Sequence, residues 1–268
     1  MWGRHPSRDL RGGVVRLLIE RRRLEQMKSD FINRAGHELR TPLATIGLVA
    51  GILEEGGTPK EMAEYWRILN EELERQRVLV ENLLVFARMD AGLFEIGRVP
   101  VDMGEVSRGA RRTAVPLAAA KSITLSSFVA PDLPLVLGDR DYLRQVLLNL
   151  LTNAVKFTPA NGRVTLRVEA VEAVEAVEAG RGSWVVAQVT DTGLGIPPED
   201  MPHLFERFFR ASNAIEQEIQ GTGMGLYMVK AIMEQLGGRV RIESSLGQGT
   251  AVTVWLPPSP QHRVPTWG

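Results

Sequence analysis

The sequence predicts two domains of different class: a long helical hairpin, followed by an α/β domain. Apolar residues recur at steps of three and four through the first third of the chain, which is typical of helices. From Val99 onward the pattern changes to strands that alternate with helices. With 268 residues, the chain is long enough for two domains that each bury a core. We expect a helical lead-in over residues 1–23, the hairpin domain over 24–92, the α/β domain over 98–257 and a disordered tail over 258–268.

The composition argues against several classes of function. The chain has 32 Lys plus Arg and 32 Asp plus Glu, so no basic surface for nucleic acid is predicted. It has no Cys, which rules out disulfides and thiolate metal sites. The longest nearly uncharged apolar stretch, residues 42–53, is shorter than the roughly 20 residues that cross a bilayer. We therefore expect a cytoplasmic protein, or the cytoplasmic portion of a membrane-bound one if an upstream segment is missing from this chain.

The first helix is predicted over residues 10–54, and it carries the most informative residue of the hairpin. Ala35 and Leu39 belong to its apolar stripe, and His37 lies two residues from each. Two residues are about 200° round an α-helix, so His37 is expected to face water if the stripe faces a core. With Glu38 beside it to hold or accept its proton, His37 is a candidate nucleophile. An ordinary surface histidine is the alternative.

The second helix is predicted from about Pro59 to Met89, after a stop and turn at residues 55–59. Thr58 is expected to cap it, with Pro59 at the first position and Glu61 at the third. Its apolar residues follow a heptad seam, and further apolar residues make the stripe too wide for one partner helix. Two hairpins are therefore expected to pair into a four-helix bundle, which predicts a homodimer. The seam consists of Met62, Trp66, Leu69, Leu73, Val80, Leu83 and Ala87, with one polar break at Gln76.

The α/β domain is expected to alternate strands and helices, with Asp139 capping one helix. Residues 168–179 are four Val-Glu-Ala repeats, for which an extension of the flanking strands and a loose helical turn both remain open. The strands are expected over residues 122–129, 133–137, 163–168, 184–189, 239–243 and 250–255, and the helices over 140–157 and 226–236.

Four short patches in this second domain together indicate a site for a phosphate-bearing ligand. In the first, Asn149 and Asn153 share a helix face, where amide oxygens suit Mg²⁺, and Lys156 can meet a phosphate. In the second, residues 191–197, Asp191 can accept a hydrogen bond from an exocyclic amine such as that of adenine. There Gly193 and Gly195 allow a sharp turn and a close approach of the ligand.

The third and fourth patches are rich in glycine. The third consists of Gly221, Thr222, Gly223, Met224, Gly225 and Leu226 and opens a helix, whose amides form an anion site. The fourth, residues 247–250, includes Thr250 and lies in a terminal hairpin, where a simple turn is the alternative.

These motifs, in this order, resemble those of bacterial sensor histidine kinases over nearly all of residues 20–256. Residues 31–43 resemble the phosphoacceptor H-box, 149–158 the N-box, 191–196 and 221–226 the two glycine boxes, and 204–210 the F-box before an ATP lid. The resemblance implies a dimerisation and histidine phosphotransfer domain followed by a Bergerat-type α/β sandwich. It also implies ATP and Mg²⁺ as ligands, a mobile lid over roughly residues 203–222, and a response regulator receiver domain as partner.

The resemblance also implies residue roles. His37 becomes the phosphoacceptor, Glu38 its base, and Thr41 the residue that orients water when the regulator is dephosphorylated, a surface threonine being the equal alternative. Asn149 and Asn153 match the Mg²⁺ positions. The remaining nucleotide contacts fall on Lys156, Phe157, Asp191, Gly193, Gly195, Ile196, Arg210, Gly221, Thr222, Gly223, Gly225, Leu226 and Thr250.

Two departures from the family pattern stand out. Phe157 occupies a position where many members have Tyr, so it can stack on a base but offers no hydroxyl, and Gly36 weakens the helix beside His37.

Two other functions fit the motifs less well. An ATPase of the same superfamily would not need His37 and Glu38 on a dimeric hairpin, and a non-enzymatic scaffold would not need Asn153, Asp191 and the glycine boxes.

Overall fold

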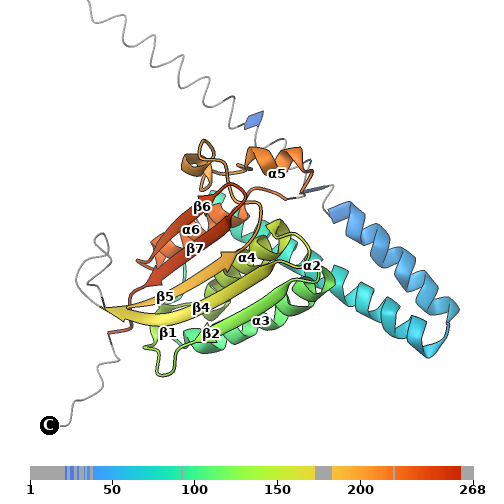
Figure 1. Cartoon of the computed structure of the whole chain (residues 1–268), viewed down its shortest axis with the longest axis horizontal. Helices are drawn as coiled ribbons and strands as arrows, with labels where there is room; N and C mark the ends of the chain where they lie inside the picture. The colour runs from blue at the N-terminus through green and yellow to red at the C-terminus, as the bar shows by residue number, and fades with distance from the viewer. Residues whose placement is uncertain are drawn as a thin grey trace, which may run out of the picture.

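A computed structural model describes residues 22, 25–26, 29, 33, 35–36, 39–91, 93–172, 183–219 and 221–260. Within these residues the chain forms a projecting helical hairpin and a sheet covered by helices (Figure 1). No helix in this part of the chain combines the length and the apolar character needed to cross a bilayer.

The hairpin forms as its sequence pattern predicts. Residues 39–55 are helical, as are the isolated described positions before them, and α2 runs Pro59–Asp90. The Thr58 hydroxyl accepts from the Glu61 amide at 3.4 Å, and the Glu61 carboxylate accepts from the Thr58 amide at 2.9 Å, which is the predicted capping box. Between the two helices, Gln76 Nε2 donates to the Leu39 carbonyl at 3.1 Å.

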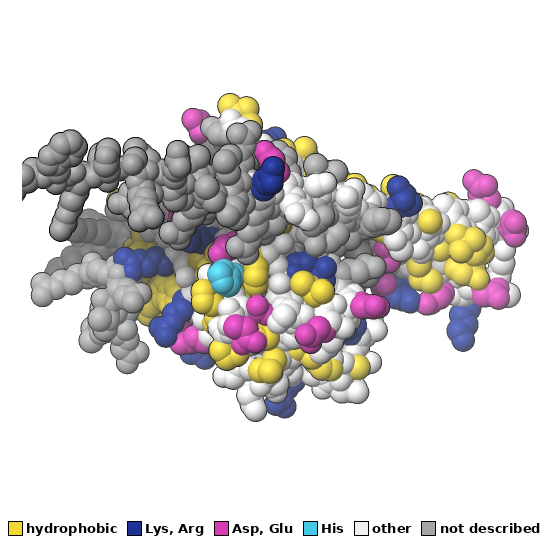
Figure 2. Space-filling view, turned by 90° about the horizontal axis from the view of Figure 1, so that it is seen from above, with side chains coloured by type: hydrophobic (Ala, Val, Ile, Leu, Met, Phe, Trp, Pro, Cys, Tyr) yellow, Lys and Arg dark blue, Asp and Glu magenta, His cyan; other side chains and the backbone are white. Residues whose placement is uncertain are grey.

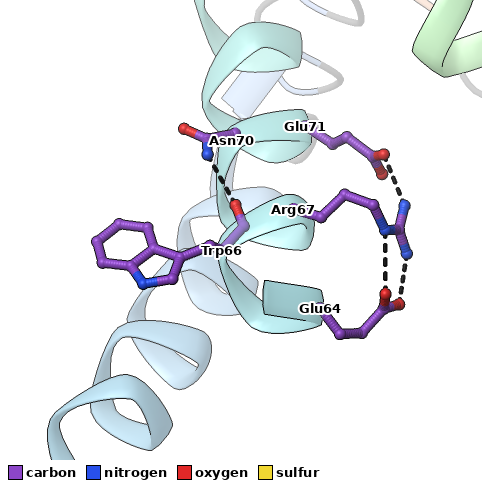
Figure 3. Close-up of polar contacts among 5 residues, drawn as sticks. All are labelled: Glu64, Trp66, Arg67, Asn70 and Glu71. Atoms are coloured by element: carbon purple, nitrogen blue, oxygen red, sulfur yellow. Dashed lines mark hydrogen bonds and ion pairs between the residues drawn. The ribbon is translucent and has the colours of Figure 1, made fainter. Parts of the chain in front are cut away.

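The outer surface of α2 has a polar side and an apolar side. Arg67 donates to the carboxylates of Glu64 and Glu71 at distances of 2.5 to 3.2 Å, while the Trp66 ring points away from these ion pairs (Figure 3). Trp66 is 52% exposed and Leu73 is 48% exposed. Apolar side chains also gather on the projecting end of the hairpin (Figure 2). A single chain therefore leaves part of the predicted seam in contact with water.

The α/β domain is built on a five-stranded sheet of order β2-β4-β5-β7-β6, in which β2 and β4 are parallel and the other neighbours are antiparallel. A separate antiparallel pair joins β1 to β3. The strands are β1 Val99–Val101, β2 Thr124–Val129, β3 Val136–Gly138, β4 Arg163–Glu172, β5 Ser183–Asp191, β6 Arg239–Ser245 and β7 Gly249–Leu256.

Three helices cover one face of this sheet (Figure 1). Strand β4 shows why, because its residues alternate: Val164, Leu166 and Val168 are buried under the helices, and the residues between them are exposed. The covering helices are α3 Met103–Ala120, α4 Arg140–Phe157 and α6 Gly225–Gln235, and two short turns, η1 Met201–His203 and α5 Ser212–Glu216, lie between β5 and α6.

Most predicted elements are confirmed, with differences that have local causes. The strand expected over residues 133–137 is β3, which begins only at Val136, because Pro134 has no amide to donate and the partner β1 has three residues. The strand expected from Ser122 begins at Thr124, because Ser122 has a positive φ of 57° after the end of α3. The sequence interpretation left α3 unassigned, although Asp102 caps it and buried alanines line it.

The Val-Glu-Ala repeat and the two chain ends are only partly described. Strand β4 continues through Glu172, which pairs with Ser183 of β5, so the start of the repeat extends a strand. Residues 173–182, the tail beyond residue 260 and most of the lead-in lie outside the described residues.

The hairpin also packs against the α/β domain. The ring of Phe86 on α2 meets the ring of Phe208 edge to face, with centroids 5.3 Å apart. Ala35 and Met224 are buried in the same small cluster, and Leu83 packs beside it. Phe208 and Met224, which lie between the end of β5 and the start of α6, are therefore in contact with the helical domain.

Candidate functional site

A cavity of about 270 Å³ lies in the α/β domain, where the end of α4, the end of β5 and the start of α6 meet. Every nucleotide-contact residue predicted from the sequence lines this cavity except Gly193, which lies next to it and donates to Asp191. The fold therefore brings together four patches that are up to a hundred residues apart in the chain.

Asn149 and Asn153 lie together on the face of α4 that borders the cavity, as their four-residue spacing predicts. Asn149 is only 3% exposed, and its Nδ2 has no hydrogen-bond partner within the described part of the chain. A Cβ placed on Gly225 would lie 3.5 Å from Asn153 Nδ2 and 3.8 Å from Asn149 Oδ1. Both amides are thus close to the first residue of α6, a helix whose N-terminal amides favour an anion.

Asp191 ends β5 and is held by two backbone amides. The amides of Gly193 and Thr250 donate to its Oδ1 at 2.8 and 3.2 Å, and neither bond occupies Oδ2. The residue is 8% exposed, and this burial raises the pKa of the carboxyl, although the two amides act in the opposite direction. The carboxylate is therefore fixed in orientation with one oxygen available to a hydrogen-bond donor in the cavity.

Two glycines in the predicted boxes are required by the geometry. Gly195 has a positive φ of 64°, and a Cβ there would lie 2.0 Å from the Ser245 carbonyl oxygen. Gly223 has a positive φ of 73°, and a Cβ there would lie 2.6 Å from the Phe209 carbonyl oxygen. The glycines expected from the motif are thus explained by close contacts.

The cationic candidates have partners within the protein. Lys156 Nζ lies 5.0 Å from the centroid of the Phe157 ring, and both side chains line the cavity. Arg210 also lines it, and its Nη2 donates to the carbonyls of Ala214, at 3.5 Å, and Ile219. In this structure Arg210 therefore holds the backbone around α5, and a phosphate contact by its guanidinium stays a prediction.

The predicted lid, residues 203–222, contains α5 and is tied to the loop after β5. Ser212 donates from both its amide and its hydroxyl to Asp200 Oδ2 at 2.7 Å, and Asn213 Nδ2 donates to the Gly195 carbonyl at 2.9 Å. These polar bonds hold α5, whose buried residue is Ala214, while Leu204 and Phe208 are buried elsewhere in the predicted lid. Gln220 lies outside the described residues, and the mobility expected of the lid stays a prediction.

The phosphoacceptor candidates are described only in part. His37 and Glu38 lie outside the described residues, while the adjacent Gly36 is helical and exposed. Thr41 is exposed on the same helix, and Pro42 continues that helix in a buried position. Exposure of Thr41 agrees with either of its two predicted roles.

Several cavity residues were missed by the sequence interpretation. The most notable is Leu79, because it belongs to α2 and brings the helical domain to the edge of the cavity. Its position in an apolar stripe gave no sign of this, since such a stripe indicates packing of any kind. Others are Thr152, Leu194 and Phe209, which lie within the motifs but were given no role, and Asn213, Ile242 and Val252, which lie outside the boxes.

Comparison with known proteins agrees with this geometry. Residues 138–260 match the family described as histidine kinase-, DNA gyrase B- and HSP90-like ATPases, and residues 27–92 match the His Kinase A phospho-acceptor domain.

Individual relatives also match most of this chain. The chain is 34% identical over 262 residues to the histidine protein kinase DivJ of Caulobacter vibrioides, covering 91% of this chain and 42% of DivJ. It is 31% identical over 251 residues to the autoinducer 2 sensor kinase/phosphatase LuxQ of Vibrio harveyi, covering 92% of this chain and 28% of LuxQ. The full-length structure of ShkA in complex with AMPPNP matches with a TM-score of 0.57 and 30% identity, covering 88% of this chain and 46% of ShkA.

The chain belongs to the sensor histidine kinases, the ATP-dependent protein histidine kinases of two-component signal transduction. It combines their phospho-acceptor domain with their ATP-binding domain, and the cavity lies in the latter. It spans less than half of the length of DivJ and of LuxQ.

Proposed function

We propose that this chain transfers the γ-phosphoryl group of ATP to its own His37 and then to an aspartate of a response regulator. The observation that carries the proposal is the cavity, in which a fixed carboxylate, two helix amides, a lysine and a helix N-terminus converge. The match of residues 27–92 to a phospho-acceptor domain supports an acceptor histidine on the hairpin.

The adenine end of the nucleotide belongs at Asp191 in this proposal. Its Oδ2 is suited to accept a hydrogen bond from an exocyclic amine, because Oδ1 is already held by two amides. Ile196 and Leu226 supply apolar walls of the same cavity, and Phe157 is available to stack.

The phosphate end belongs at the junction of α4 and α6. Lys156 and the N-terminal amides of α6 attract the negative charge, as do the backbone groups of Gly221, Thr222 and Gly223. The buried Asn149 amide, lacking a protein partner among the described residues, fits a site that a ligand completes. Mg²⁺ bound with the phosphates near Asn149 and Asn153 would neutralise charge that develops during transfer.

The chemical step falls on the hairpin. A ring nitrogen of His37 attacks the γ-phosphorus, so that a nitrogen–phosphorus bond forms as the bond to the departing ADP oxygen breaks. Glu38 accepts the proton from the other ring nitrogen or holds the ring in the reactive tautomer. The remaining residues mainly position these groups, which is the usual source of rate enhancement in phosphoryl transfer.

The proposed partners are a second copy of this chain and a receiver domain. The half-exposed Trp66 and Leu73 on α2 are suited to the core of a four-helix bundle formed by two hairpins. LuxQ is named as a kinase and a phosphatase, and exposed Thr41 is the residue we propose for dephosphorylation in this chain. Cytoplasmic location of these domains stays a prediction from the sequence.

The proposal is tested by incubating the purified chain with γ-labelled ATP. Wild type should acquire an acid-labile label, and His37→Gln should acquire none while binding a non-hydrolysable ATP analogue as tightly as wild type. Labelling of His37→Gln at the wild-type rate would reject His37 as the acceptor. ATP hydrolysis without any protein label would instead favour the simple ATPase.

A further inference from the structure

Lys121 lies at the end of α3 and contacts the end of α4, outside every motif identified in the sequence. Its Nζ donates to three backbone carbonyls, those of Val155 at 3.0 Å, Lys156 at 2.9 Å and Thr158 at 2.8 Å. An ammonium group has three donors and no acceptor, so these three bonds use its full capacity. Burial lowers the pKa of this lysine from its ordinary value, which agrees with a head group partly withdrawn from water.

The lysine is hydrogen-bonded to the last turn of α4, in the ATP-binding domain. A helix end leaves its last four carbonyls without partners inside the helix. Here the Ala154 carbonyl accepts from the amide and the hydroxyl of Thr158, and the Phe157 carbonyl accepts from the Leu194 amide at 3.2 Å. The two remaining carbonyls, of Val155 and Lys156, accept from Lys121 Nζ. The positive charge of Lys121 therefore also lies at the negative end of the helix dipole.

This turn carries two of the residues that line the cavity. Lys156 and Phe157 project from it into the nucleotide site, and the bond from the Leu194 amide links it to the loop that begins at Asp191. Among the described residues Lys121 does not line the cavity itself. A shift of the turn would therefore move groups at both the phosphate end and the adenine end of the site.

We propose that Lys121 is a positioning residue for nucleotide binding, because its ammonium fixes the last turn of α4 from which Lys156 and Phe157 enter the cavity. This inference rests on the proposed function of that cavity. It predicts a role in ATP affinity, and it predicts little effect on the chemical step, since His37 belongs to the other domain.

The test compares Lys121→Met and Lys121→Arg, each in the 268-residue chain, with wild type. Methionine keeps most of the side-chain length but offers no donor, and arginine keeps the charge and several donors. Val106→Ala is the matched control, because Val106 is a buried residue of the same helix α3 and does not line the cavity. Each protein is measured for thermal unfolding without ligand, for ATP-analogue affinity by calorimetry, and for KM and kcat of autophosphorylation.

We expect Lys121→Met to weaken analogue affinity and to raise the KM for ATP by about tenfold, with kcat within about twofold of wild type. Lys121→Arg should recover at least half of the lost affinity on a logarithmic scale. Val106→Ala should lower the unfolding temperature and leave affinity unchanged. If Lys121→Met does not fold, the same comparison is made with Lys121→Arg alone, which should bind more weakly than the control.

Three results would overturn the inference. They are unchanged affinity in Lys121→Met, an equal loss of affinity in the Val106→Ala control, and a fall in kcat without a rise in KM. A wild-type chain that binds no nucleotide would instead reject the proposed function of the cavity, so the two failures are distinguishable.

Discussion

Replacing Asp191 with asparagine tests the assignment of the adenine end of the cavity. The substitution keeps the size of the side chain and one carbonyl oxygen, which can still accept from the amides of Gly193 and Thr250. In that orientation the new NH₂ group occupies the place of Oδ2 and faces the cavity. A donor then meets the exocyclic amine of adenine, which is itself a donor.

The magnitude follows from the loss of one charge-assisted hydrogen bond in a buried place. Such a bond contributes about 1.5–3 kcal/mol. Asp191 is 8% exposed, so water has little access to replace the bond. ATP affinity should therefore fall by about 10- to 150-fold, since about 1.4 kcal/mol corresponds to a factor of ten. GTP has a carbonyl at the equivalent position, so its affinity should fall less or even rise.

The assay is calorimetric titration of wild type and Asp191→Asn with non-hydrolysable analogues of ATP and GTP. Asp102→Asn is the control, because Asp102 also accepts two backbone amides on Oδ1, at 2.7 and 3.4 Å, but caps α3 away from the cavity. The control should bind both analogues like wild type. Unchanged ATP affinity in Asp191→Asn, or an equal loss for both nucleotides, would refute the reasoning.

The remaining predictions concern four other properties of the chain. Burial raises the pKa of Asp191 above its ordinary value, so the folded state holds this proton more tightly than the unfolded state. Ligand-free wild type should therefore lose stability relative to Asp191→Asn as the pH rises above that ordinary value, and a difference in unfolding temperature independent of pH would contradict this. Asn153→Ala should lower the autophosphorylation rate more than adenosine affinity, which kinetics and calorimetry separate; equal losses would argue against a role at the phosphates. Leu73→Ala, at a residue 48% exposed in one chain, should destabilise a bundle dimer by about 2–5 kcal/mol, and sedimentation of wild type as a monomer at micromolar concentration would reject the dimer. Thr41→Ala should retain autophosphorylation and lose dephosphorylation of a phosphorylated regulator; equal dephosphorylation rates would leave Thr41 a surface residue.

Much of the site was predictable from the sequence because its chemistry depends on residue types at fixed spacings. Asn149 and Asn153 share a helix face whatever surrounds them, and both line the cavity as predicted. The position of Asp191 at the end of a strand could be predicted from the apolar run before it, and β5 is that strand. The helix caps at Thr58 and Asp139 were equally local, and both are confirmed.

What could not be predicted depends on contacts between segments distant in sequence. Lys121 contacts residues 34 to 37 positions away, and no motif marks a lysine that bonds only to carbonyls. Leu83 belongs to the heptad seam and Leu79 to the wider apolar stripe, yet Leu79 borders the cavity and Leu83 packs beside Phe86 and the α/β domain. Apolar periodicity shows that a face is covered, and it does not show by what.

In the proposed function, ATP bound in this cavity delivers a phosphoryl group to His37. This is tested by digesting the 268-residue chain after incubation with ATP, keeping the peptides at alkaline pH, and locating the phosphoryl group by mass spectrometry. We expect one phosphorylated peptide that contains His37. Its phosphoryl group should be labile in acid and absent when Asp191 is replaced by asparagine at limiting ATP. A phosphoryl group on a serine, threonine or other histidine peptide, with the His37 peptide unmodified, would contradict it.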